Sequence, residues 1–174
     1  MLAGCGGGTA HSAAPTRGEV SAAFRGSPAV LALLHGQADR LLGGGVRAVR
    51  ARLAALKNYP VVINKWASWC GPCQTEFPAF QQASVRYGRQ VAFIGIDGKD
   101  GNGSAAAFLR RFPVSYPSYT DPHESIADAI QAATYYPQTL FFVRGPHTSY
   151  VYDHAGPYET AAALETDIRR YVLR

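Results

Sequence analysis

Cysteine is scarce in this sequence, which holds three among 174 residues. Three cysteines are too few for the disulfide framework of a small secreted scaffold. The sequence also lacks a run of about 18 apolar residues, the length that a membrane-spanning helix needs. We therefore expect that this chain is not an integral membrane protein. A continuous basic run and a recognisable nucleic-acid-binding motif are missing as well, which argues against a nucleic-acid partner.

The composition is that of a folded protein. Hydrophobic residues make up 47% and charged residues 17%, enough for one packed domain with a modest extension. The net charge is +5, and residues 1–57 carry all of it, because the remainder holds ten basic and ten acidic side chains. Such a segment can attract anionic lipid headgroups or an acidic partner, but a solvated helix face is the simpler interpretation.

The first 20 residues are rich in glycine, alanine, serine and threonine and predict a flexible tail. Within it the tetrapeptide LAGC, residues 2–5, resembles the lipobox at which a bacterial lipoprotein precursor is cleaved and its cysteine lipidated. Cys5 is therefore a candidate lipidation site. Only Met1 precedes the motif, so this interpretation implies a longer precursor. Chance occurrence in a chain rich in these residues is the alternative.

Residues 21–57 predict a basic helical extension. Ser27 and Pro28 form a helix-start signal, and an apolar stripe runs from Val30 to Leu41. After the glycines of 43–45 the stripe resumes at helical spacing. We expect this pair of helices to pack on the rest of the protein rather than to bind a partner. The second stripe consists of Val46, Val49, Leu53 and Leu56.

The remaining segment, 58–174, alternates strand and helix patterns. This order predicts an α/β domain with a mixed central sheet and helices on both faces. Residues 97–103 resemble a calcium loop only faintly and are interpreted as a surface loop. The expected strands are 59–64, 90–97, 139–143 and 149–153, the last two as a hairpin, and the expected helices are 70–88, 104–112, 124–133 and 159–173.

The motif WCGPC, residues 69–73, directly follows a predicted strand and opens a helix. Two thiols at this spacing can close a small disulfide, and a helix N-terminus stabilises a thiolate. Cys70 at the helix mouth is the expected exposed nucleophile, and Cys73 the buried resolving thiol. A zinc site needs about four ligands, and neither a second CxxC nor a spaced histidine pair is present, so no metal is expected.

The stretch VVINKWASWCGPC, residues 61–73, resembles the thioredoxin fold, and in particular the extracytoplasmic TlpA/ResA-like thiol–disulfide oxidoreductases. The resemblance extends over about residues 59–173. It implies a cis bond before Pro137, which would bring the Tyr136 backbone beside the dithiol to pair with a substrate strand. It also implies that Trp69, Gly71 and Pro72 border the substrate groove.

Further positions refine the resemblance. Asn64 stands where cytosolic thioredoxins have a buried aspartate. Glu76 stands where ResA-like proteins carry an acidic residue, which implies an acid/base role, with a solvated helix-face carboxylate as the alternative. Two departures are Lys65, in place of a common aromatic residue, and the helical pair in place of an N-terminal β-hairpin.

The resemblance implies a cofactor-free enzyme that uses the Cys70–Cys73 pair to reduce protein disulfides outside the cytoplasm, for example in cytochrome c maturation. A membrane thiol would donate the electrons, and a lipid anchor could tether the protein to the cell membrane. A disulfide oxidase or isomerase stays open, because the reduction potential relative to the compartment sets the direction. A non-catalytic binding protein on the same fold is the weaker alternative.

Overall fold

The computed structural model describes residues 15–174, so Cys5 and the lipobox-like tetrapeptide lie outside the described residues. The helices are α1 (Arg17–Ala23), α2 (Ala29–His35), α3 (Gly45–Ala55), α4 (Gly71–Tyr87), α5 (Asn102–Arg111), α6 (Ser125–Ala129) and α7 (Ala161–Asp167), which continues as a π-helix over Ile168–Val172. The strands are β1 (Leu41–Leu42), β2 (Val61–Trp66), β3 (Ala92–Gly98), β4 (Ser118–Asp121), β5 (Gln138–Phe142) and β6 (Tyr152–Ala155).

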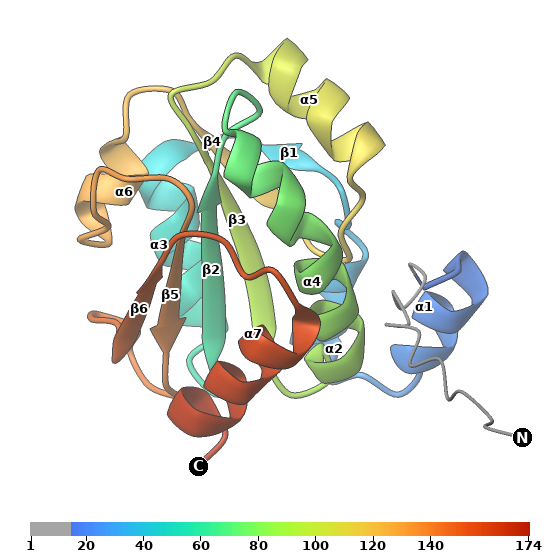
Figure 1. Ribbon diagram of the computed structural model, residues 1–174. Helices are drawn as coiled ribbons and strands as arrows, with labels where there is room; N and C mark the ends of the chain where they lie inside the picture. Colours follow the sequence, from blue (N-terminus) through green and yellow to red (C-terminus); the bar gives the residue numbers. More distant parts are fainter. Residues whose placement is uncertain (1–14) are drawn as a thin grey trace, which may run out of the picture.

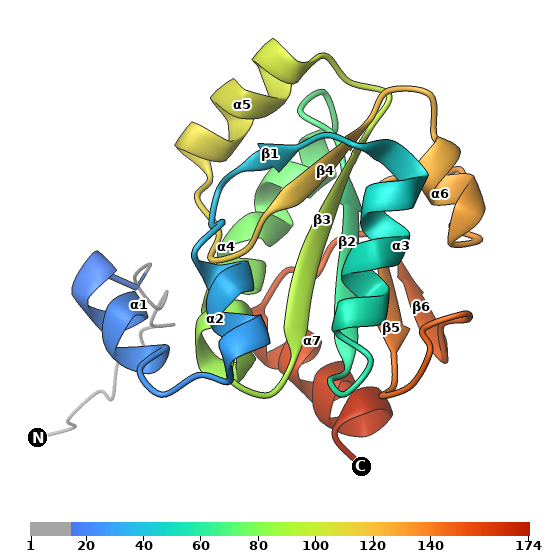
Figure 2. The same cartoon turned by 180° about the vertical axis from the view of Figure 1, so that it is seen from behind.

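The strands form one mixed sheet in the order β1-β4-β3-β2-β5-β6. The first four are parallel neighbours, and β5 and β6 join as antiparallel strands. Helices α4, α5 and α7 cover one face, while α2, α3 and α6 cover the other (Figures 1 and 2). This arrangement confirms the predicted α/β fold with helices on both faces.

Strand β2 lies at the centre of the sheet and is buried along its whole length. Its alternate side chains enter opposite layers, as the two-residue period of a strand requires. Val62 and Trp66 join the cluster beneath α4, and Val61 and Ile63 join the cluster beneath α3. Two hydrophobic layers therefore hold this strand, and the residues that follow it are positioned firmly.

Helices α2 and α3 pack on the sheet, as expected for the helical pair of this segment. Leu31, Leu34 and Leu53 are buried in the same cluster as Ile63 and Ile94. No helix within residues 15–174 is long and apolar enough to cross a membrane.

The predicted first helix of this segment is too long. Helix α2 ends at His35, and Leu41 and Leu42 instead form β1 beside Ser118 and Tyr119 of β4. The chain turns at Asp39, which has a φ of 58° and accepts a hydrogen bond from the backbone of a distant residue. Because this long-range contact holds the turn at Asp39, the helix stops before the apolar stripe does.

Other boundaries also differ from the sequence expectations. The composition assigns residues 17–20 to the tail, but they belong to helix α1. This helix begins with a capping box between Thr16 and Glu19. Strand β4 was not predicted, because it is short and directly follows Pro117. Strand β6 starts at Tyr152 rather than at residue 149, and α6 ends at Ala129.

Neighbouring leucines of α2 test whether the N-terminal helices belong to the core. Leu34 is fully buried and Leu33 is 69% exposed. Replacing Leu34 by alanine should lower the free energy of unfolding by about 2–5 kcal/mol, because a cavity remains. Leu33→Ala should change it by about 0.5 kcal/mol or less. Urea unfolding measures both, and equal effects would show that α2 does not pack as described.

Candidate active site

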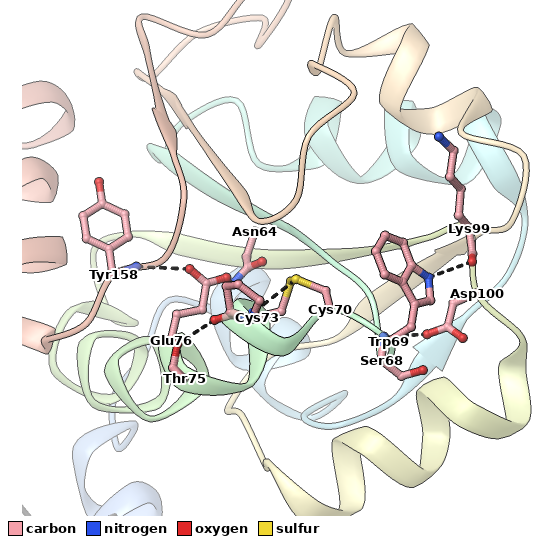
Figure 3. The surroundings of a disulfide bond; sticks show 11 residues. Asn64, Ser68, Trp69, Cys70, Cys73, Thr75, Glu76, Lys99, Asp100 and Tyr158 are labelled. Atoms are coloured by element: carbon pink, nitrogen blue, oxygen red, sulfur yellow. Dashed lines mark hydrogen bonds between the residues drawn. A yellow bond between two sulfur atoms is a disulfide. The ribbon is translucent and has the colours of Figure 1, made fainter.

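The CGPC motif occupies the junction between β2 and α4. Cys70 is the N-cap of α4, and Pro72 lies in the first turn, where its missing N–H costs nothing. Cys70 and Cys73 form a disulfide, and the Cys73 N–H also donates a hydrogen bond to the Cys70 Sγ at 3.2 Å (Figure 3). The sulfur of Cys70 therefore lies at the positive end of a 17-residue helix.

Both cysteines are buried in this disulfide form, with exposures of 3% for Cys70 and 0% for Cys73. The expected exposure of Cys70 is therefore wrong for the oxidised chain. The bond to Cys73 holds the Cys70 sulfur against the core, where Trp66 and Phe77 belong to the same cluster.

The loop after β3 fixes the segment that leads into Cys70. The Ser68 N–H donates to the Asp100 carboxylate at 2.6 Å, and the Trp69 Nε1–H donates to the Lys99 carbonyl oxygen at 2.9 Å (Figure 3). Trp69 is still 56% exposed. A large aromatic surface therefore stands beside the disulfide with a fixed orientation.

The Tyr136–Pro137 peptide bond is cis, as predicted. The Tyr136 ring packs edge-on against Trp69, with 5.1 Å between the ring centroids. The segment before β5 and the segment before Cys70 therefore meet in space, although Tyr136 stands 66 positions after Cys70 in the sequence. Pairing of the Tyr136 backbone with a substrate strand stays a prediction.

Glu124 is a site residue that sequence reasoning missed. Its carboxylate lies 3.0 Å from Lys65 Nζ and 2.6 Å from Lys99 Nζ, and it accepts a hydrogen bond from the Tyr136 hydroxyl at 2.8 Å. Partial burial alone would raise the pKa of Glu124, but the hydrogen bonds from these three donors outweigh it and lower the pKa to about 2. The available signal was Lys65 itself, because a lysine in a buried strand needs an anionic partner.

Glu76 lies one helical turn after Cys73 and is completely buried. Its carboxyl accepts hydrogen bonds from Asn64 Nδ2 at 2.9 Å and from the Tyr158 N–H at 3.3 Å (Figure 3). Burial raises the pKa of Glu76 to about 8, and these two hydrogen bonds oppose the rise only in part. The alternative of a solvated helix-face carboxylate is therefore wrong.

Residues 97–103 are not wholly a surface loop. Asp97 and Gly98 are the buried end of β3, and only the residues after them leave the sheet. Burial, followed by the neighbouring charge of Asp100, raises the pKa of Asp97 to about 8. Within residues 15–174, no group of three or more histidine, cysteine, aspartate or glutamate side chains could hold a metal ion.

A dithiol motif at the N-terminus of a helix, beside a cis-proline on a mixed sheet, defines a thioredoxin-like site. The AhpC/TSA family matches residues 45–151. The chain belongs to this family.

Relatives and solved structures agree with this assignment. A thiol:disulfide interchange protein DsbE homolog of Paracoccus denitrificans is 32% identical over 102 residues, which are 55% of this chain and 50% of that protein. The thiol-disulfide oxidoreductase ResA of Bacillus subtilis is 27% identical over 81 residues, 46% of this chain and 45% of that protein. The chain thus spans about half the length of these curated relatives. A crystal structure of a DsbE-type interchange protein from Chlorobium tepidum has a TM-score of 0.60 at 24% identity, over 68% of this chain and 83% of that one, and supports the fold.

The buried carboxyl of Glu76 predicts a pH-dependent stability. The unfolded chain releases this proton near pH 4.5, whereas the folded chain keeps it up to about pH 8. The stabilising contribution of this group is therefore complete below pH 4.5 and is lost as the pH rises through 8. Glutamine does not titrate, so Glu76→Gln should gain stability relative to the wild type between about pH 5 and pH 9, by a few kcal/mol.

Urea unfolding of the oxidised protein at a series of pH values measures this difference. The exposed Glu159 supplies the control, since Glu159→Gln should shift stability little and equally at every pH. A difference between Glu76→Gln and the wild type that stays constant with pH would contradict the assignment.

Proposed function

We propose that this protein is a thiol–disulfide oxidoreductase whose redox centre is the Cys70–Cys73 pair. The observation that carries the proposal is the disulfide at the N-terminus of α4, one turn before a completely buried carboxyl group. The names of the relatives, an interchange protein and an oxidoreductase, support the same reaction class. The reaction needs no cofactor, because the two sulfurs carry the electron pair.

The first half of the reaction uses Cys70. Its thiolate, stabilised by the Cys73 N–H and the helix N-terminus, attacks a substrate disulfide. A Cys70–substrate disulfide forms, the substrate bond breaks, and the first substrate sulfur leaves as a thiolate that takes a proton from water.

The second half uses Cys73 and Glu76. In its ionised form, which a pKa of about 8 leaves accessible near neutral pH, the Glu76 carboxyl accepts the Cys73 proton as general base, and the resulting thiolate attacks the Cys70 sulfur. The Cys70–Cys73 bond forms, the mixed disulfide breaks, and the second substrate sulfur leaves as a thiolate that takes a proton from water. The substrate gains two electrons, and the protein ends as the disulfide. Reversal of the same steps oxidises a dithiol.

The substrate groove in this proposal lies between the two aromatic segments. Trp69 offers an exposed ring, and Tyr136 packs against it. The Tyr136 backbone, placed by the cis bond to Pro137, would pair with an extended substrate strand. Gly71 and Pro72 would line the groove at the dithiol, where a small residue leaves room for the substrate chain.

The finer proposal is a reductant that works outside the cytoplasm. The Gly71–Pro72 dipeptide is that of reducing thioredoxins, and the tetrapeptide at residues 2–5 supports a lipid anchor on Cys5 at the cell membrane. Electrons would come from a membrane thiol donor. Protein disulfides are the substrates, with the cysteines of apocytochrome c before haem attachment as an example implied by the resemblance.

The division of labour between the cysteines can be tested by trapping. Cys73→Ser should accumulate a mixed disulfide with a peptide substrate, because Cys70 still attacks and no thiol resolves the adduct. Cys70→Ser should form no adduct and lose turnover. Non-reducing mass spectrometry and an insulin-reduction assay measure the two effects. Full turnover by Cys70→Ser would overturn the proposed function.

A further inference from the structure

Glu76 must lose in every turnover the proton that it accepts from Cys73, yet its side chain has no contact with solvent. Its neighbour Phe77 and the nearby Phe80 on α4 are buried and apolar. A proton that leaves the carboxyl therefore needs a polar route along this face of the sheet.

The register of the strands supplies a row of polar side chains at this level. Asn64 of β2 pairs with Thr139 of β5, and Thr139 pairs with His154 of β6. Directly opposed residues of antiparallel strands point to the same face, with Cβ atoms about 4.5–5.5 Å apart. The row starts at Asn64, which binds Glu76, and ends at His154 on the edge strand of the sheet.

The adjacent row confirms which face these side chains occupy. Val62, Phe141 and Tyr152 pair across the same three strands and pack in the cluster beneath α4. Residues two positions along each strand share that face. Thr139 and His154 therefore lie on the Glu76 side of the sheet.

The interior of the row holds two buried polar atoms without a partner. Asn64 Oδ1 and Thr139 Oγ1 make no hydrogen bond with any residue of the described chain. Buried polar atoms nearly always have partners, so two on paired residues call for an explanation. A threonine hydroxyl can donate and accept at the same time, which suits it to pass a proton on.

His154 connects the row to the surface. Its ring stacks on Tyr158 with 4.0 Å between centroids, and the Tyr158 N–H donates to Glu76. His154 is partly exposed and lines a surface pocket together with Tyr158, Glu159 and Asp167. It is the side chain of the row that reaches solvent, and the nitrogens of an imidazole ring can both accept and donate a proton.

We propose that His154 is the proton-relay residue of Glu76. The proton passes from the Glu76 carboxyl through the Thr139 hydroxyl and water to the neutral imidazole, which releases it to solvent at the pocket. Glu76 returns to the carboxylate and His154 to the neutral form, so one proton leaves per turnover. This inference rests on the proposed function, because it concerns the base of that reaction.

Chemical rescue tests the relay. In weakly buffered solution, His154→Ala should lower the turnover of disulfide reduction by about tenfold, and added imidazole at the same pH should restore most of it. The wild type should not respond to imidazole. His123→Ala, which removes an exposed histidine outside the row, should behave like the wild type.

A second pair of variants probes the interior of the row. Thr139→Val keeps the shape but removes the hydroxyl, and should reproduce the loss, whereas Thr139→Ser should retain turnover. Glu76→Gln should lose turnover without any rescue by imidazole, because the base itself is gone.

The outcomes separate the two proposals. Unchanged turnover of His154→Ala would overturn the relay and leave the proposed oxidoreductase activity intact. A loss of turnover that imidazole does not restore would do the same, because it would show that the role of His154 is purely structural. Wild-type turnover by Glu76→Gln would also overturn it, because no proton would need carrying. A wild type without disulfide turnover would overturn the proposed function and the relay together.

Discussion

The burial of the Glu76 carboxyl is the constraint on which the site depends. The central strand β2 runs directly into α4, so the helix starts at the end of the sheet and its first turns lie on the core. Glu76 falls on the inner side of the second turn, where hydrogen bonds hold it but water does not reach it. The same geometry places both cysteines at the positive end of the helix, one turn before a carboxyl group that favours its protonated form.

A second electrostatic centre supports the other side of the site. Glu124 forms ion pairs with two lysines and accepts a hydrogen bond from the Tyr136 hydroxyl. One of the two lysines, Lys65, is buried in β2. The Lys65 ammonium also lies 4.0 Å from the centre of the Tyr136 ring. Breaking such a buried pair would leave a charge without compensation, so the network fixes the aromatic ring next to the cis-proline. The Tyr136 ring of the proposed groove is thus held by this charged network, and the Cys70–Cys73 pair is held by the hydrophobic core.

Much of this could be predicted from the sequence, because the signals were local. Strand alternation and the WCGPC spacing each depend on a few neighbouring residues, whereas the cis bond before Pro137 was implied by the family resemblance. The fold and the cis bond are confirmed. What failed depends on distant contacts. The two-residue strand β1 exists only because β4 lies beside it, and Glu124 joins the site through ion pairs with Lys65 and Lys99, which lie far from it in the sequence. Burial of Cys70 depends on the core cluster around it, which includes Trp66 and Phe77 and which the spacing of the motif does not show.

The central claim is that Cys70 and Cys73 cycle reversibly between dithiol and disulfide. Its most direct test is the midpoint potential of the pair, obtained by equilibrating the protein with glutathione or dithiothreitol mixtures and alkylating the free thiols. We expect one reversible two-electron transition near the thioredoxin value of about −270 mV. A value near the DsbA potential of about −120 mV would contradict the reductant and indicate an oxidase. Failure to observe a reversible transition would contradict the redox function itself.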